Sequence, residues 1–63
     1  MIRKEDWMFK GAIVNALGKK ATITKMDDNS FDGNDYVYRI YCKVEGKSFA
    51  NPYHPTDVKQ IIL

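Results

Sequence analysis

Arg39, Tyr41 and Lys43 stand at alternate positions in the segment YVYRIYCKV, residues 36–44. Alternate residues of a strand share one face of a sheet, so these side chains would form a row of cation, ring and cation. Such a row can follow a phosphate backbone and stack a base on the ring. The same residue types are also ordinary on the solvent face of a small β-protein. The pattern therefore predicts either a single-stranded nucleic-acid surface or a plain outer face.

Lys19 and Lys20 are a second pair of cations, directly after Gly18. Gly11 and Gly18 lie seven residues apart and no helix is expected after the lysines, so the segment does not match a phosphate-binding loop. From a turn between two strands, both lysines could still contact phosphate. We include them in the candidate binding residues.

Cys42 and His54 are the only pair that could supply a nucleophile and a base. Cys42 falls on the face expected to be buried, and no third residue is evident that would orient the histidine. One cysteine excludes an intrachain disulfide, and one histidine beside it is too little for a zinc site. We therefore expect no catalysis, no metal site and no cofactor.

Residues 27–35, DDNSFDGND, hold four of the eight acidic residues and no basic one. The remaining chain carries ten basic and four acidic residues, a net charge of +6, although the whole chain has only +2. In an alignment with an EF-hand loop, Arg39 stands where the bidentate glutamate belongs, and no helices flank the segment. We interpret 27–35 as a solvated acidic loop, with Phe31 folded back onto the core in preference to the alternative of an exposed binding anchor.

The length of 63 residues, with 44% hydrophobic and 29% charged, fits a single folded domain over 1–63, in which 1–6 could be flexible. Lys10 and Asn15 interrupt the apolar stretch near the N-terminus. It is therefore too polar for a signal peptide or a membrane span. A single thiol fits a reducing compartment, so we expect a cytoplasmic protein.

Periodicity and turn residues predict five short strands and little helix. Strands are expected near 11–17 and 20–26, and 36–44 is the strongest strand pattern. The residues of this strand expected to face the core are Tyr36, Tyr38, Ile40, Cys42 and Val44. The following Glu-Gly pair is predicted as a two-residue hairpin loop, which sets Cys42 opposite a buried Phe49. The prolines of NPYHPTDVKQIIL favour a 3₁₀ turn at PTDV and a closing strand VKQIIL.

This order of elements resembles the SH3-like small barrels. The similar features are a Gly-x-x-Val opening (GAIV), two strands joined by a turn, an acidic loop, a hairpin, a proline-tyrosine turn (NPYHPTDV) and a last strand, over about residues 8–62. GAIVNALGKKATI is also loosely similar to the KOW-type barrels. The ALYDY-like stretch and paired tryptophans of the proline-peptide-binding SH3 domains are missing. The resemblance implies an all-β, five-stranded SH3-like barrel that binds protein or nucleic acid.

Apolar residues near both termini offer a contact for a protein partner or a second copy of the chain. These residues are Trp7, Phe9, Ile61 and Leu63. The function expected first is a small binding or adaptor module, accessory or regulatory, that acts through protein–protein interaction. The alternative is binding of single-stranded nucleic acid, with no membrane involved in either case.

Overall fold

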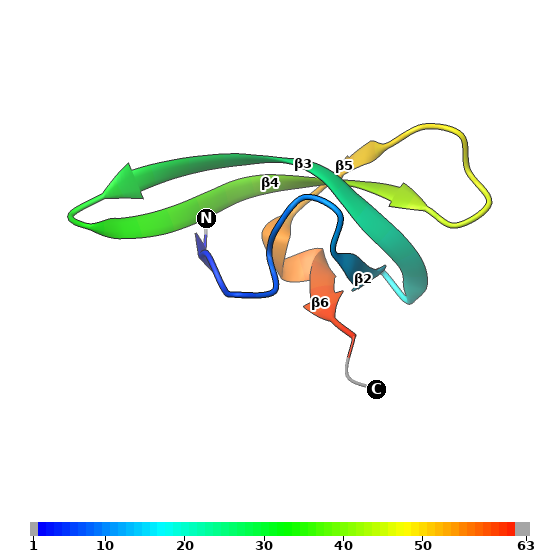
Figure 1. The fold of residues 1–63 in the computed structure, drawn as a ribbon, viewed down its shortest axis with the longest axis horizontal. Helices are drawn as coiled ribbons and strands as arrows, with labels where there is room; N and C mark the ends of the chain where they lie inside the picture. The colour runs from blue at the N-terminus through cyan, green and yellow to red at the C-terminus, as the bar shows by residue number, and fades with distance from the viewer. Residues whose placement is uncertain (1, 62–63) are drawn as a thin grey trace.

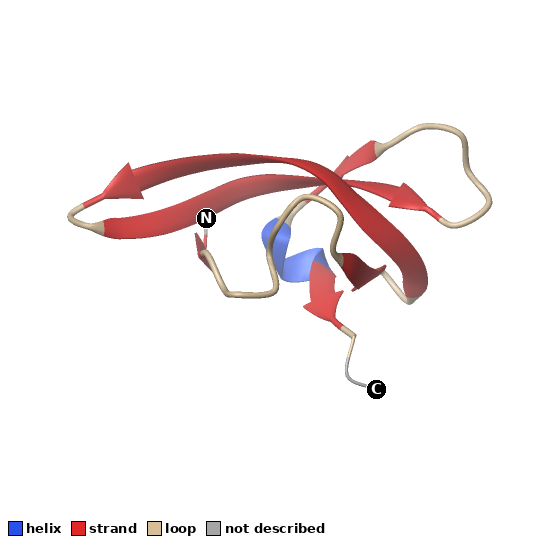
Figure 2. Cartoon of the chain, in the orientation of Figure 1, coloured by secondary structure: helices blue, strands red, loops and turns tan. Residues whose placement is uncertain are grey.

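The computed structural model describes residues 2–61, which form an all-β protein with one short helical turn (Figure 2). In chain order the elements are β1 (Ile2–Arg3), β2 (Ile13–Ala16), β3 (Lys19–Phe31), β4 (Asn34–Val44), β5 (Asn51–Tyr53), the 3₁₀ helix η1 (Pro55–Asp57) and β6 (Val58–Gln60). The 3₁₀ turn expected just before the last strand is confirmed.

All six strands belong to one antiparallel sheet, ordered β1-β4-β3-β2-β6, with β5 also paired to β4. The short strands β1 and β5 lie along the same edge of β4, because β3 occupies the other edge. The sheet is strongly curled (Figure 1). Within residues 2–61, β6 pairs with β2 alone, so the sheet forms a half-barrel and not the closed five-stranded barrel expected from the sequence.

The core lies on the inner face of the curled sheet and under the loop before β2. Its buried side chains are Met8, Ala12, Val14, Ala16, Ala21, Ile23, Val37, Ile40, Cys42, Val44 and Val58. Alternate residues of β2 and β3 supply four of them, as the period of a strand requires. Full burial of a Val or Ile side chain stabilises the fold by about 1.5–3 kcal/mol, so these few contacts carry most of its stability.

The predicted core face of β4 is confirmed for residues 40–44 and wrong before them. Val37 is buried, whereas Tyr38 is 46% exposed. The ladder pairs Val37 and Arg39 with two consecutive residues of β3, so Tyr38 has no partner there and forms a β-bulge. The extra residue reverses the alternation, which is why two-residue periodicity fails in this part of the strand.

The predicted acidic loop over 27–35 is wrong, because both strands continue through it as a hairpin. We call residues 27–37 the arm; it projects along the long axis of a molecule that measures 39 × 25 × 17 Å (Figure 1). Asp32 and Gly33 form its turn with φ values of 53° and 77°, the pattern of a two-residue type I′ turn. Phe31 does not fold back onto the core; it is 67% exposed beside the turn.

The predicted register of the second hairpin is also wrong. The connection from β4 to β5 has six residues, 45–50, and Cys42 lies opposite Asn51. Phe49 therefore belongs to the loop and is 60% exposed. The Lys47 amide donates to the Val44 carbonyl at 2.9 Å, which closes a turn at the start of the loop. The chain pairs with β4 again only at Asn51, where β5 begins.

Candidate functional site

Arg39, Tyr41 and Lys43 share the outer face of β4, opposite the buried Ile40 and Cys42. Arg39 and Lys43 are exposed, and Tyr41 is half-buried. Their partners on β3 are, respectively, Asp27, Lys25 and Thr22. The structure thus brings these three candidate residues together and adds a cation and an acid from the next strand.

Tyr41 is held at its hydroxyl group and over a face of its ring. Arg39 Nη1 donates to Tyr41 Oη at 3.3 Å, and Tyr41 Oη donates to Asp27 Oδ2 at 3.2 Å. Lys25 Nζ lies 5.3 Å from the ring centroid, in a cation–π geometry. The hydrogen bond to Tyr41, followed by the charges of Tyr41 and Asp27, raises the pKa of Arg39 above its ordinary value. The ring is therefore fixed, and a base could stack on it only where Lys25 does not cover it.

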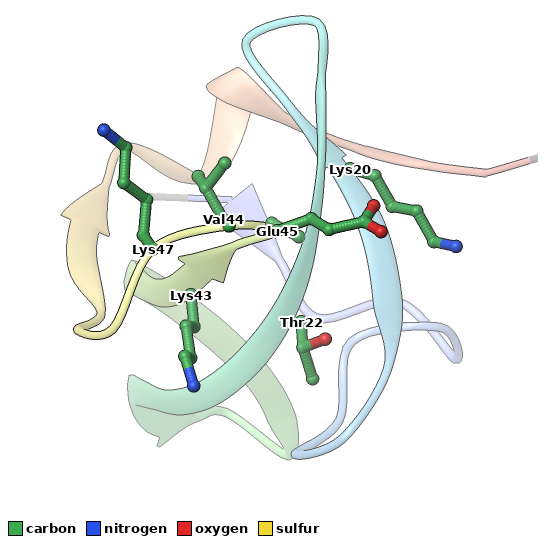
Figure 3. Close-up of a pocket in the computed structure, with 8 residues that line it drawn as sticks. Lys20, Thr22, Lys43, Val44, Glu45 and Lys47 are labelled. Atoms are coloured by element: carbon green, nitrogen blue, oxygen red, sulfur yellow. The ribbon is translucent and has the colours of Figure 1, made fainter.

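Lys19 and Lys20 begin β3, directly after the turn from β2. Lys20 lines a surface hollow at the end of the β3–β4 pair together with Lys43, Lys47 and Glu45. Figure 3 shows the three lysine side chains extending in different directions from this hollow. Their ammonium groups do not converge on one point, so the hollow is not shaped to hold a single phosphate.

The apolar edge expected near the termini is not one surface. Trp7 is half-buried in a groove between the N-terminal segment and β6, against the core. Phe9 is exposed at a separate hollow beside Asp6 and Asp35. Ile61 lines a third hollow, on the outer side of β2. Leu63 lies outside the described residues.

The third hollow was not anticipated from the sequence. We call it the β2 hollow; it has a volume of about 580 Å³ and is lined by Ile13, Asn15, Gly18, Lys20 and Ile61. Ile13 points away from the core, since Ala12 and Val14 on either side are buried, and 49% of its surface is exposed. The alternation of side chains along GAIVNA predicts that Ile13 faces away from the core. The sequence interpretation assigns the apolar run to a strand but does not assign its residues to the two faces.

The turn beside the β2 hollow presents a second apolar side chain. Leu17 is 64% exposed and has φ of 52°, a left-handed conformation unusual for a bulky residue. The turn is fixed because the Gly18 amide donates to Asn15 Oδ1 at 2.7 Å and the Leu17 amide to the Asp57 carbonyl at 3.2 Å. An exposed leucine is thus held in a costly conformation at the edge of an apolar hollow.

Lysines flank the β2 hollow on both sides. Asn15 pairs with Lys20 of β3 and with Lys59 of β6, so the three side chains form a row across the outer face. Both lysines are exposed. The hollow therefore combines an apolar floor with a positive rim.

Cys42 and His54 have separate structural roles. Cys42 is fully buried in the core, and this burial raises the pKa of its thiol from 9.0 to about 11. His54 caps η1, where its Nδ1 accepts from the Thr56 amide at 3.3 Å. Over residues 2–61, no group of three or more His, Cys, Asp or Glu side chains is placed to hold a metal ion.

No protein-family model matches the sequence, and the searches of curated proteins and of solved structures found no match. The described part of the chain contains no helix with the length and apolar character needed to cross a membrane.

Proposed function

We propose that this protein is a small non-catalytic binding module that recognises a protein through the β2 hollow. The observation that carries the proposal is the outward-facing Ile13, which is half exposed although it begins a paired strand, β2. Ile61 lines the same hollow, and Leu17 is exposed in the turn next to Gly18, another lining residue. Apolar side chains that remain outside a core provide the buried centre of many protein interfaces.

We further propose that the half-barrel belongs to the SH3-like small barrels. The support is topological: β3, β4 and β5 follow one another as a meander, β2 lies between β3 and β6, and η1 precedes β6. That is the order of elements on which the sequence resemblance rests. The additional strand β1 and the arm are departures from it.

The chemistry of the β2 hollow defines the partner it fits. Its apolar floor suits an aromatic or aliphatic side chain. Lys20 lines the hollow and Lys59 lies next to it, opposite Asn15, so carboxylates are favoured around that side chain. The partner surface is therefore expected to present an apolar anchor flanked by acidic residues. Its association rate should decrease as the salt concentration rises.

Site-specific photo-crosslinking in the native cell tests this proposal. A photoreactive aromatic amino acid at position 13 should give a discrete crosslinked product, and Lys20→Glu in the same protein should abolish it. The matched control carries the crosslinker at Phe49, which is exposed in a loop that does not line the hollow. The same products from both positions, or none from position 13, would contradict binding at the hollow.

A second candidate function is binding of single-stranded nucleic acid by the outer face of β3 and β4. The supporting observation is that Lys25 lies opposite Tyr41 and joins the row of Arg39, Tyr41 and Lys43. Asp27 opposes it, because it neutralises part of the charge beside Arg39 at 3.8 Å. Fluorescence anisotropy with a labelled oligothymidine should show binding that weakens steeply with salt and on Tyr41→Ala. An absence of binding at low salt would exclude this function.

A further inference from the structure

We propose that the partner of the β2 hollow is the tip of the arm of a second copy of this chain, so that the protein associates head to tail. This inference rests on the proposed function of the hollow and specifies its occupant.

The arm is fixed by the N-terminal segment. β1 pairs with β4 at Tyr36 and Val37, and the Lys4 amide donates to the Asp35 carbonyl at 2.8 Å. Arg3 Nη2 donates to Asn34 Oδ1 at 2.8 Å, close to the turn. These contacts bind the arm near its end, where an isolated two-stranded hairpin would be marginally stable. Little conformational entropy is then lost when the tip binds.

The tip of the arm presents an exposed aromatic ring beside an acidic residue. Phe31 pairs with Asn34 and lies on the outer face, two thirds exposed, directly before the Asp32-Gly33 turn. Asp32, in the turn, is exposed next to it. Asp35 pairs with Ser30 and projects from the opposite face of the arm, where its Oδ1 accepts a hydrogen bond from Ser30 Oγ. The tip thus offers an apolar anchor beside one carboxylate, a combination that the β2 hollow should select.

The β2 hollow provides the complement in shape and in charge. Its volume of about 580 Å³ exceeds that of one phenyl ring, and Ile13 and Ile61 supply apolar contacts for it. Lys20 and Lys59 flank Asn15 on the outer face, and with Phe31 in the hollow they would lie near Asp32 of the incoming arm. Burial of the ring supplies the affinity, and the charge pairs favour the correct orientation.

The two surfaces lie at different ends of the molecule. The tip of the arm ends the long axis on one side, whereas the turn between β2 and β3 lies toward the other side (Figure 1). A rigid arm therefore cannot reach its own hollow. The contact joins two unlike surfaces, so assembly closes as a reciprocal pair or a ring, or continues as a chain.

Sedimentation velocity over a range of protein concentrations tests the inference. At low salt the wild type should form dimers and larger species, and 0.5 M salt should shift it toward monomer. Phe31→Ala removes the anchor and Lys20→Glu removes part of the rim, so each variant alone should be monomeric. Phe49→Ala is the matched control, since it removes an equally exposed phenylalanine from a loop outside both surfaces; it should associate as the wild type does.

A mixture of the two variants provides the decisive measurement. Phe31→Ala retains an intact hollow and Lys20→Glu retains an intact arm, so an equimolar mixture should form a complex that stops at two chains. Wild-type protein that stays monomeric at every concentration overturns self-association. Association that persists in both single variants, or a mixture that stays monomeric, also overturns it. A crosslink from position 13 to a different protein would then leave the proposed function intact with another occupant.

Discussion

Replacement of Leu17 by Asn tests whether the turn between β2 and β3 is strained. Leu17 adopts the left-handed conformation, with φ of 52°. For most residues with a Cβ atom this conformation costs about 1–2 kcal/mol of folding free energy, but Asn tolerates it because its short polar side chain can hydrogen-bond locally. Leu17→Asn would create an Asn-Gly turn, the favoured pair for two positive φ angles. Gly18 already satisfies the second position, with φ of 84°.

The lost packing of the leucine side chain has to be separated from this gain. About a third of Leu17 is covered in the structure. Burial of a whole leucine side chain contributes about 1.5–3 kcal/mol, so its partial burial contributes about 0.5–1 kcal/mol. Leu17→Ala loses the same packing and keeps the left-handed penalty. We therefore expect Leu17→Asn to be about 1 kcal/mol more stable than Leu17→Ala and at least as stable as the wild type.

Urea unfolding followed by the fluorescence of Trp7 measures these differences in the free energy of unfolding. In a thermal unfolding experiment, a difference of 1 kcal/mol would appear as a difference of about 4–8 °C in melting temperature for a domain of this size. Equal stability of Leu17→Asn and Leu17→Ala would show that the turn is unstrained and would refute the reasoning.

Two further predictions concern the core and the outer face. Because burial raises the pKa of Cys42 to about 11, the unfolded chain ionises first, and the free energy of unfolding should fall by about 1.4 kcal/mol per pH unit between pH 9 and 11. Below pH 9 the thiol is protonated in both states, and Cys42→Ala should remove this component of the pH profile measured by urea unfolding. Tyr41→Phe removes the hydroxyl that links Arg39 to Asp27 and should destabilise the fold by about 0.5–1 kcal/mol. Tyr38→Phe, at a ring outside that network, should change stability less, and equal effects would contradict a structural role for the Tyr41 hydroxyl.

The sequence predicts the β class, the η1 turn and the buried face of residues 40–44, because these depend on local alternation and on proline chemistry. It does not predict which residues face the core on the far side of a β-bulge. Thr24 and Tyr38 are each an extra residue relative to the paired strand, and nothing in their side chains requires a bulge at those positions. The pairing of Lys25 and Asp27 with the candidate row follows only once both bulges are placed.

The arm was missed for a different reason. Its Asp-Gly pair is a strong signal for a hairpin turn, but the surrounding acidic and polar residues have low strand propensity and favoured a loop. In the structure, pairing with β1 and the hydrogen bond from Arg3 to Asn34 support these residues as strands. Tertiary contacts thus override local preference in the arm. The contacting residues come from the N-terminus and from the arm itself, which are far apart in the sequence, so local patterns do not predict the pairing.

The contacts of Tyr41 explain why the β2 hollow is favoured as a binding surface over the row of Arg39, Tyr41 and Lys43 on β4. Tyr41 already interacts with Asp27, Arg39 and Lys25, so a ligand that stacks on its ring has to compete with those groups. Ile13 and Leu17 have no comparable partners over the exposed parts of their side chains. Burial of about 100 Å² of apolar surface there would contribute about 2.5 kcal/mol before the losses of binding are counted. A partner therefore gains more at the hollow than on the occupied face.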